Sequence, residues 1–83
     1  MAAKPPPSST QARREALAHE VRARRTALGL TQGQVAQRVG CDRQTINRVE
    51  HALVSPSLDR WLLIADALEV SLADLIAAAN LPG

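Results

Sequence analysis

The sequence contains very few aromatic residues and a single cysteine. Phe and Tyr are absent, and Trp61 is the one aromatic side chain among 83 residues. A hydrophobic core must therefore consist of Leu, Ile, Val and Ala, and this composition, with few β-branched runs, favours helices over strands. Cys41 has no second cysteine to pair with, which excludes an internal disulfide and fits a reducing compartment.

Long apolar runs are also missing. No apolar stretch approaches the ~20 residues that a membrane-spanning helix requires, and no signal-peptide core follows Met1. The length leaves room for one domain, which would bury about 60–65% of the surface of its unfolded chain. We therefore expect a cytoplasmic protein without membrane contact.

The residue patterns of enzymes and metal sites are absent as well. His19 and His51 are far apart in the sequence and lack metal-ligand spacing to Cys41. No Gly-rich phosphate loop occurs, and no serine has the sequence context of a nucleophile. We predict that the protein is not an enzyme and uses neither a cofactor nor a metal ion.

Charge is distributed unevenly along the chain. Up to Arg48 there are nine Lys and Arg residues against three acidic residues, a net charge of +6. From Val49 onward there is one basic residue, Arg60, against five acidic residues, a net charge of −4. A basic half beside an acidic half suggests one side that faces a polyanion, and nucleic acid is the expected partner.

The most informative stretch is Thr31 to Glu50, TQGQVAQRVGCDRQTINRVE. Thr31 followed by Gln34 has the pattern of a helix-starting capping box. Gly40 permits the left-handed backbone that ends a helix and redirects the chain. Between them, one helical face carries the apolar residues Val35, Ala36 and Val39.

A second short helix is predicted after Asp42, which can act as its N-cap. Ile46 and Val49 would face inward at helical spacing. The opposite face carries Arg43, Gln44, Asn47 and Arg48. Arg can hydrogen-bond bidentately to a guanine edge, and Gln or Asn can do so to adenine, which suggests base recognition.

This pattern resembles the helix-turn-helix of the phage-repressor-like (Cro/cI, or Xre-type) DNA-binding family. The matching residues are small Ala36 where the helices approach, Gly40 in the turn, and the apolar residues Val35, Val39, Cys41, Ile46 and Val49. RRTALGLTQ upstream and PSLDRWLLIADALEVSLADLI downstream extend the resemblance over residues 14–79. It implies an all-α, five-helix, lambda-repressor-like DNA-binding domain with a central helix-turn-helix.

The expected elements follow from periodicity, capping residues and this resemblance. A disordered tail is predicted for residues 1–9, which include three consecutive prolines. The DNA-binding domain would cover residues 10–80. Its helices are predicted at residues 10–28, 32–39, 43–50, 58–68 and 72–79.

Two apolar stripes are predicted to complete the core. In the fourth helix the stripe consists of Leu58, Trp61, Leu62, Ala65 and Leu68, with Leu63 almost opposite. In the fifth helix the inward residues would be Leu72, Leu75, Ile76 and Ala79.

The resemblance also implies roles for individual residues. The helix at residues 43–50 would enter the major groove, where Arg43, Gln44, Asn47 and Arg48 would read bases. Thr31, Gln32 and Arg22 would contact phosphates, which fix the position of the protein on DNA and carry no sequence information. Arg25 and Glu50 would form a structural ion pair between the first and third helices.

The loop at residues 51–57 departs from the family pattern. Ala52 stands where glycine is usual, and Leu53 and Val54 stand where polar or basic residues are usual. Together with Leu63, these two apolar residues are predicted to form a dimer or protein-partner surface.

The functional prediction is a sequence-specific DNA-binding transcriptional regulator, a repressor that reads a palindromic operator as a homodimer. We expect it in the bacterial or phage-infected cytoplasm, associated with the nucleoid. One alternative is a protein-interaction module of the same fold, such as an antitoxin that holds its toxin on the acidic half. Another is a restriction-modification controller protein.

Overall fold

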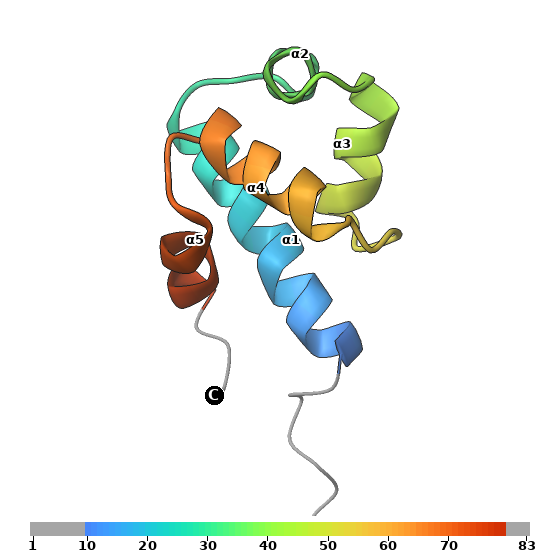
Figure 1. Ribbon diagram of the computed structural model, residues 1–83, viewed down its shortest axis with the longest axis vertical. Coiled ribbons are helices and arrows are strands. Elements are labelled where there is room, and N and C mark those ends of the chain that lie inside the picture. Colours follow the sequence, from blue (N-terminus) through green and yellow to red (C-terminus); the bar gives the residue numbers. More distant parts are fainter. Residues whose placement is uncertain (1–9, 80–83) are drawn as a thin grey trace, which may run out of the picture.

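Residues 10–79 are described by the computed structural model, and within them the chain forms five helices joined by short loops (Figure 1). The predicted tail at residues 1–9 lies outside the described residues. The all-α, five-helix prediction is confirmed, and no helix within residues 10–79 is long and apolar enough to cross a bilayer. The helices are α1 (Thr10–Ala27), α2 (Gln32–Val39), α3 (Arg43–Glu50), α4 (Leu58–Ala67) and α5 (Leu72–Ala78).

Each helix after α1 begins at a side chain that caps it. Thr31 Oγ1 accepts a hydrogen bond from the Gln34 N–H at 3.0 Å, and Gln34 Oε1 accepts one from the Thr31 N–H at 2.8 Å. This reciprocal capping box satisfies two donors that the helix start would otherwise leave free. Asp42, Ser57 and Ser71 cap the other three helices in the same N-cap position.

Two helices end in left-handed backbone without glycine. Ala52 has a φ of 56° after α3, and Glu69 has a φ of 60° after α4. The Leu53 N–H still donates to the Arg48 carbonyl at 2.9 Å, which closes the usual C-terminal motif. The helix stop after α3 therefore persists with alanine, at the conformational cost that a Cβ brings to this region.

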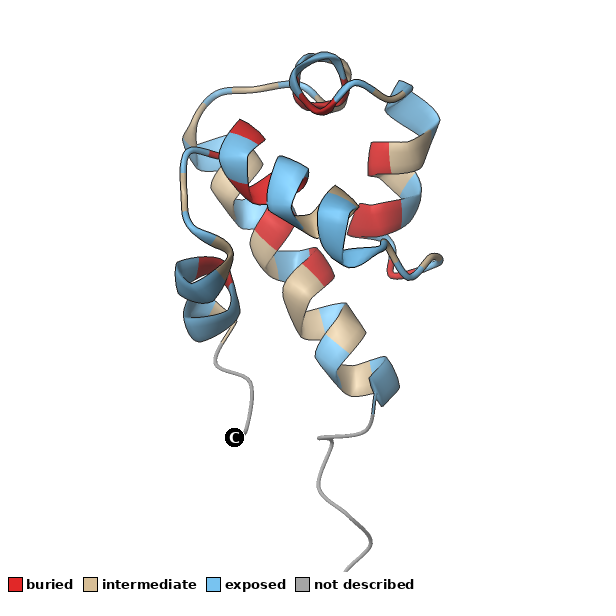
Figure 2. Cartoon of the chain, in the orientation of Figure 1, coloured by how far each residue is buried: buried red, intermediate tan, exposed pale blue. Residues whose placement is uncertain are grey.

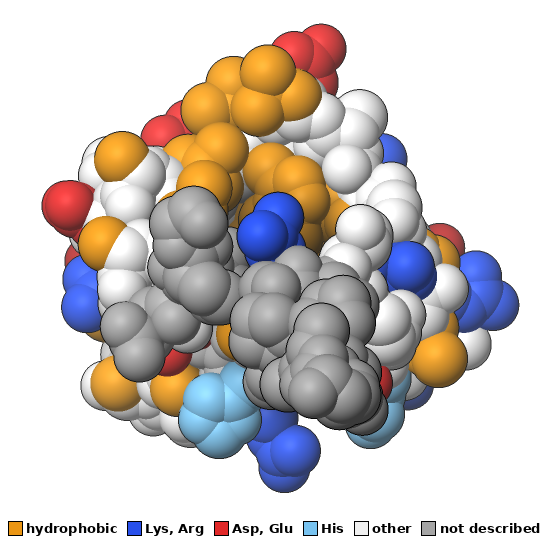
Figure 3. Space-filling view, turned by 90° about the horizontal axis from the view of Figure 1, so that it is seen from below, with side chains coloured by type: hydrophobic (Ala, Val, Ile, Leu, Met, Phe, Trp, Pro, Cys, Tyr) orange, Lys and Arg blue, Asp and Glu red, His pale blue; other side chains and the backbone are white. Residues whose placement is uncertain are grey.

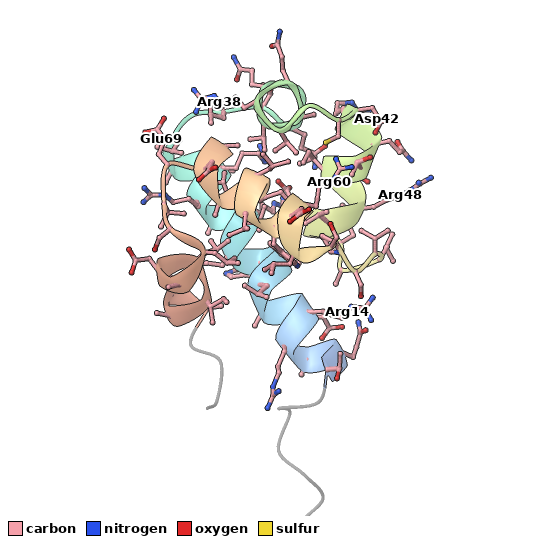
Figure 4. All side chains as sticks on the ribbon, viewed as in Figure 1. Arg14, Arg38, Asp42, Arg48, Arg60 and Glu69 are labelled. Atoms are coloured by element: carbon pink, nitrogen blue, oxygen red, sulfur yellow. The ribbon has the colours of Figure 1, made fainter. Side chains whose placement is uncertain are left out.

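Arginine side chains satisfy carbonyl groups at these helix ends. At the end of α4, Arg24 Nε donates to the Leu68 carbonyl at 3.0 Å. Arg38, labelled in Figure 4, donates from Nη1 to the Ala67 carbonyl, also at 3.0 Å. At the end of α3, Arg14 Nη2 donates to the Ala52 carbonyl at 3.3 Å. These three arginines tie helices together through backbone carbonyl groups, although the Arg38 side chain is still 44% exposed.

The core lies where α1 to α4 converge, with α5 closing it on the side of α1 (Figure 2). Every helix contributes apolar side chains, so the core joins the whole described chain. The largest fully buried residues are Val21, Val35, Ile46, Ile64, Leu68 and Leu75. As the sequence indicates, none is aromatic.

The predicted inward stripe of α4 is wrong in part. Leu58 and Leu62 are 67% and 46% exposed, whereas Ile64 is fully buried. Trp61 is partly buried and packs against the core, as expected, and Leu63 is exposed. Because α4 is apolar around much of its circumference, periodicity could not select the face that packing against α2 and α5 selects.

In α5 the prediction holds for Leu75 and Leu72 and is wrong for Ile76, while Ala79 is partly buried. Leu75 is 1% exposed, Leu72 is half-buried against the core, and Ile76 is 39% exposed. The α5 helix touches α1 and α4 along one side, so a residue one position further round its axis faces outward.

Candidate nucleic-acid interface

The outer face of α3 presents a row of polar side chains with planar ends. Arg43, Gln44 and Arg48 are exposed, Asn47 is partly buried, and Ile46 on the other face is fully buried. Figure 1 shows α3 at the side of the molecule, joined by a short turn to α2, which is seen end-on. This placement leaves the four polar side chains accessible to a large partner such as a DNA groove.

An ion pair between α1 and the last residue of α3 lies directly behind this face. Arg25 Nε donates to Glu50 Oε2 at 2.6 Å, and Arg25 Nη2 donates to Glu50 Oε1 at 3.0 Å. The side chains are 13% and 1% exposed. The hydrogen bond to Glu50 raises the pKa of Arg25, against the opposing effect of burial. The pair fixes the C-terminal end of α3 against α1 in a bidentate geometry.

Gln32, the first residue of α2, connects this pair to the polar face of α3. Its Nε2 donates to Glu50 Oε1 at 3.1 Å. Its Oε1 accepts long hydrogen bonds from Arg43 Nη1 and Asn47 Nδ2, both at 3.4 Å. The Gln32 side chain, predicted to contact phosphate, is thus partly exposed and hydrogen-bonded to three side chains of the protein.

The three residues predicted to contact phosphates do not lie together. Thr31 and Gln32 line a broad hollow of about 480 Å³ at the start of α2, together with Arg43. Arg22 lines a separate, shallow hollow of about 180 Å³ beside His51, at the other end of α3. The sequence could not reveal this separation because it depends on how α1 crosses α3.

Arg60 lies beside the polar row of α3, and the sequence analysis gave it no role. It shares a hollow of about 260 Å³ with Arg48, between α3 and the start of α4 (Figure 4). The sequence did contain a signal for Arg60, because the N-cap Ser57 places it in the first turn of α4, near the loop that follows α3. Two guanidinium groups beside one hollow can hold an anion such as a phosphate.

The partner surface predicted from the loop is only partly available. Leu53 is 68% exposed, but Val54 is half-buried against the core and lines the hollow beside Arg48. Leu63 is 45% exposed on α4. In the loop and α4, the exposed large apolar residues are therefore Leu53, Leu58, Leu62 and Leu63.

Asp42 is the acidic N-cap residue of α3. Its Oδ1 accepts hydrogen bonds from Thr45 Oγ1 and from the Thr45 N–H, both at 2.8 Å. The hydrogen bond from the Thr45 side chain, followed by that from its backbone, lowers the pKa of Asp42, and the nearby charges of Arg48 and Arg60 act in the same direction. The carboxylate is therefore kept ionised at the start of the helix that carries the polar row.

The fold brings His19 and His51 to the same hollow, although they are distant in sequence. Glu15 and Glu50 also line it. Residues 10–79 nevertheless contain no group of three or more His, Cys, Asp or Glu side chains placed to hold a metal ion.

Comparisons with known proteins agree with this arrangement. The helix-turn-helix family HTH_3 matches residues 21–75. A protein of Methanothermobacter thermautotrophicus, described as an uncharacterized HTH-type transcriptional regulator, is 50% identical over 48 residues, which are 58% of this chain and 70% of that protein.

Solved structures show the same fold. The restriction-modification controller protein C.AhdI from Aeromonas hydrophila is 32% identical, with a TM-score of 0.72 over 75% of this chain and 94% of that chain. The P22 c2 repressor, solved in complex with a synthetic operator, is 26% identical, with a TM-score of 0.69 over 75% of this chain and 94% of that chain. The predicted resemblance is thereby confirmed. The chain belongs to the Xre/Cro/cI-type helix-turn-helix family of DNA-binding transcriptional regulators and is not an enzyme.

Proposed function

We propose that the protein is a sequence-specific repressor that inserts α3 into the major groove of a palindromic operator. The observation that carries the proposal is the row of Arg43, Gln44, Asn47 and Arg48 on α3, backed by the Arg25–Glu50 pair. All four have planar groups that can hydrogen-bond base edges, and Arg43, Gln44 and Arg48 are exposed.

Phosphate contacts would flank this helix on both sides. At the start of α2, the Thr31 side chain and the backbone N–H groups of Gln32 and Gly33 lie at the positive end of the helix dipole, which favours a phosphate. On the other side, Arg60 and Arg48 line one hollow. Arg22, beside the C-terminal end of α3, would reach a more distant phosphate.

A homodimer is the expected binding form. One module of this size buries too little surface for a tight operator complex, and two recognition helices about 34 Å apart would read a palindrome. The contact surface would be built from Leu53, Leu58, Leu62 and Leu63, which are exposed. Figure 3, seen from the end opposite α2, shows hydrophobic side chains gathered in its upper part with acidic groups beside them. A monomeric mass at micromolar concentration would contradict this part of the proposal.

Selection from random duplexes tests the proposal. The wild type and a Gln44→Ala/Arg48→Ala variant would be compared at two salt concentrations. The expected result is an enriched palindrome with the wild type, lost in the variant. Weak binding without sequence preference that persists in the variant would contradict the proposal and favour a protein-interaction module, such as an antitoxin.

A restriction-modification controller is a narrower candidate with the same mechanism. The 32% identity to C.AhdI over 94% of that chain favours it. The enriched palindrome would then occur upstream of restriction and modification genes in the source genome.

Because the Methanothermobacter relative is archaeal, the proposed nucleoid-associated location extends to archaea as well as to bacteria and phages.

A further inference from the structure

The buried carboxylate of Glu50 determines the orientation of the Gln32 amide. An ionised carboxylate can only accept hydrogen bonds. Gln32 Nε2 lies 3.1 Å from Glu50 Oε1, and the reversed amide would place two oxygens in contact there. The usual ambiguity between amide oxygen and nitrogen is therefore resolved by the neighbour. Gln32 must direct its oxygen toward α3.

The same reasoning continues to Asn47. Gln32 Oε1 lies 3.4 Å from Asn47 Nδ2, and Arg43 Nη1, which can only donate, lies at the same distance. An acceptor on Gln32 requires a donor on Asn47, so the Asn47 amide keeps its NH₂ group toward α2. Within residues 10–79 its Oδ1 has no hydrogen-bond partner, and this oxygen is left for an external donor.

We infer that Gln32 is a specificity-determining residue that fixes the polarity of Asn47 at the DNA. With its carbonyl oxygen presented, Asn47 selects a base with an exocyclic amine in the major groove, which is adenine or cytosine. Guanine and thymine place a carbonyl oxygen at that point and are disfavoured, because the two oxygens repel each other. The inference rests on the proposed function, because it assigns a polarity to one base contact of α3.

A Gln32→Met variant removes the amide oxygen and nitrogen that connect Glu50 to Asn47, and it keeps the length of the side chain. The Asn47 amide can then rotate by half a turn and present its NH₂ group, which guanine and thymine accept. Gln37→Met is the matched control, because Gln37 is exposed on the same helix and makes no side-chain hydrogen bond within residues 10–79.

The experiment measures affinity for four duplexes that differ only at the base pair read by Asn47. That pair is identified as the one whose preference disappears in Asn47→Ala during selection. The wild type and Gln37→Met should bind the adenine or cytosine duplex about 10-fold more tightly than the guanine or thymine duplex. Gln32→Met should narrow this ratio to about 3-fold or less, with preferences at the other positions retained.

A second variant separates polarity from structural damage. Aspartate presents only acceptors in either rotation, so Gln32→Met/Asn47→Asp should recover the preference for adenine or cytosine, at lower overall affinity. The inference is overturned if the wild type prefers guanine or thymine at this pair, if Gln32→Met keeps the full ratio, or if the double variant does not recover it. Absence of any enriched sequence with the wild type would instead refute the proposed function.

Discussion

Arg25 and Glu50 link the first helix to the end of α3 through two hydrogen bonds, of 2.6 and 3.0 Å. The carboxylate also accepts from Gln32, so both of its oxygens are engaged. Its side chain is 1% exposed, and water cannot replace a missing partner easily. This one group therefore influences both the stability of the domain and the geometry of the α3 face.

Arg25→Met should strongly destabilise the domain. The substitution leaves the Glu50 carboxylate buried without its charged partner, at a cost of about 3–5 kcal/mol in the free energy of unfolding. Urea denaturation measures this cost. Arg13→Met, an exposed position on the same helix, should change stability by less than about 0.5 kcal/mol. The double variant Arg25→Met/Glu50→Leu should be more stable than Arg25→Met alone, and the reverse order would contradict the explanation.

Glu69→Gly should stabilise the domain relative to Glu69→Gln. Both remove the exposed ion pair with Arg38, but only glycine relieves the left-handed backbone, with its φ of 60°. The expected difference is about 0.5–1 kcal/mol, because a Cβ is disfavoured in this region. Thermal unfolding of the two variants measures it. A lower melting temperature for the glycine variant would show that the turn is not strained.

Much of the fold could be predicted from local sequence signals. The capping residues Thr31, Asp42, Ser57 and Ser71 each depend on bonds within one turn, so helix starts were readable. Which side of α4 faces inward depends on contacts with other helices. Leu58 and Leu62 belong to an apolar surface that is broader than the buried face, and no periodicity distinguishes the two.

The residue types of the candidate site could be predicted from the sequence, but the hydrogen bonds between its residues could not. The row on α3 follows from helical spacing, but the position of Gln32 between Glu50 and Asn47 arises from how α2 packs on α3. Charge along the chain likewise does not show which arginines bind within the protein. Arg24 and Arg38 cap the end of α4.

The pKa of Asp42 should lie below its ordinary value of 3.8. Because the folded state favours the ionised form, its contribution to stability is present above the ordinary pKa and is lost as the pH falls through the lowered value. Carboxyl NMR shifts during an acid titration measure the midpoint. Thr45→Val removes the largest cause of the shift and should move the midpoint upward. A wild-type midpoint at or above 3.8 would contradict the assigned hydrogen bonds.

Arg60→Gln should weaken DNA binding without changing the preferred sequence. If Arg60 meets a phosphate, its loss should reduce the slope of log K against log salt by about 0.9. Fluorescence anisotropy across a salt series measures this slope. Arg13→Gln serves as the charge-matched control and should leave it unchanged. An unaltered slope for Arg60→Gln would place the hollow beside Arg48 outside the interface.

The most direct test of the central claim is an NMR titration of the ¹⁵N-labelled protein with the enriched duplex. Binding through α3 and the start of α2 predicts the largest amide shift changes at residues 31–34 and 43–48, with small changes in α5. Largest changes in α5 and on the exposed side of α4, with α3 unaffected, would contradict recognition of DNA by α3.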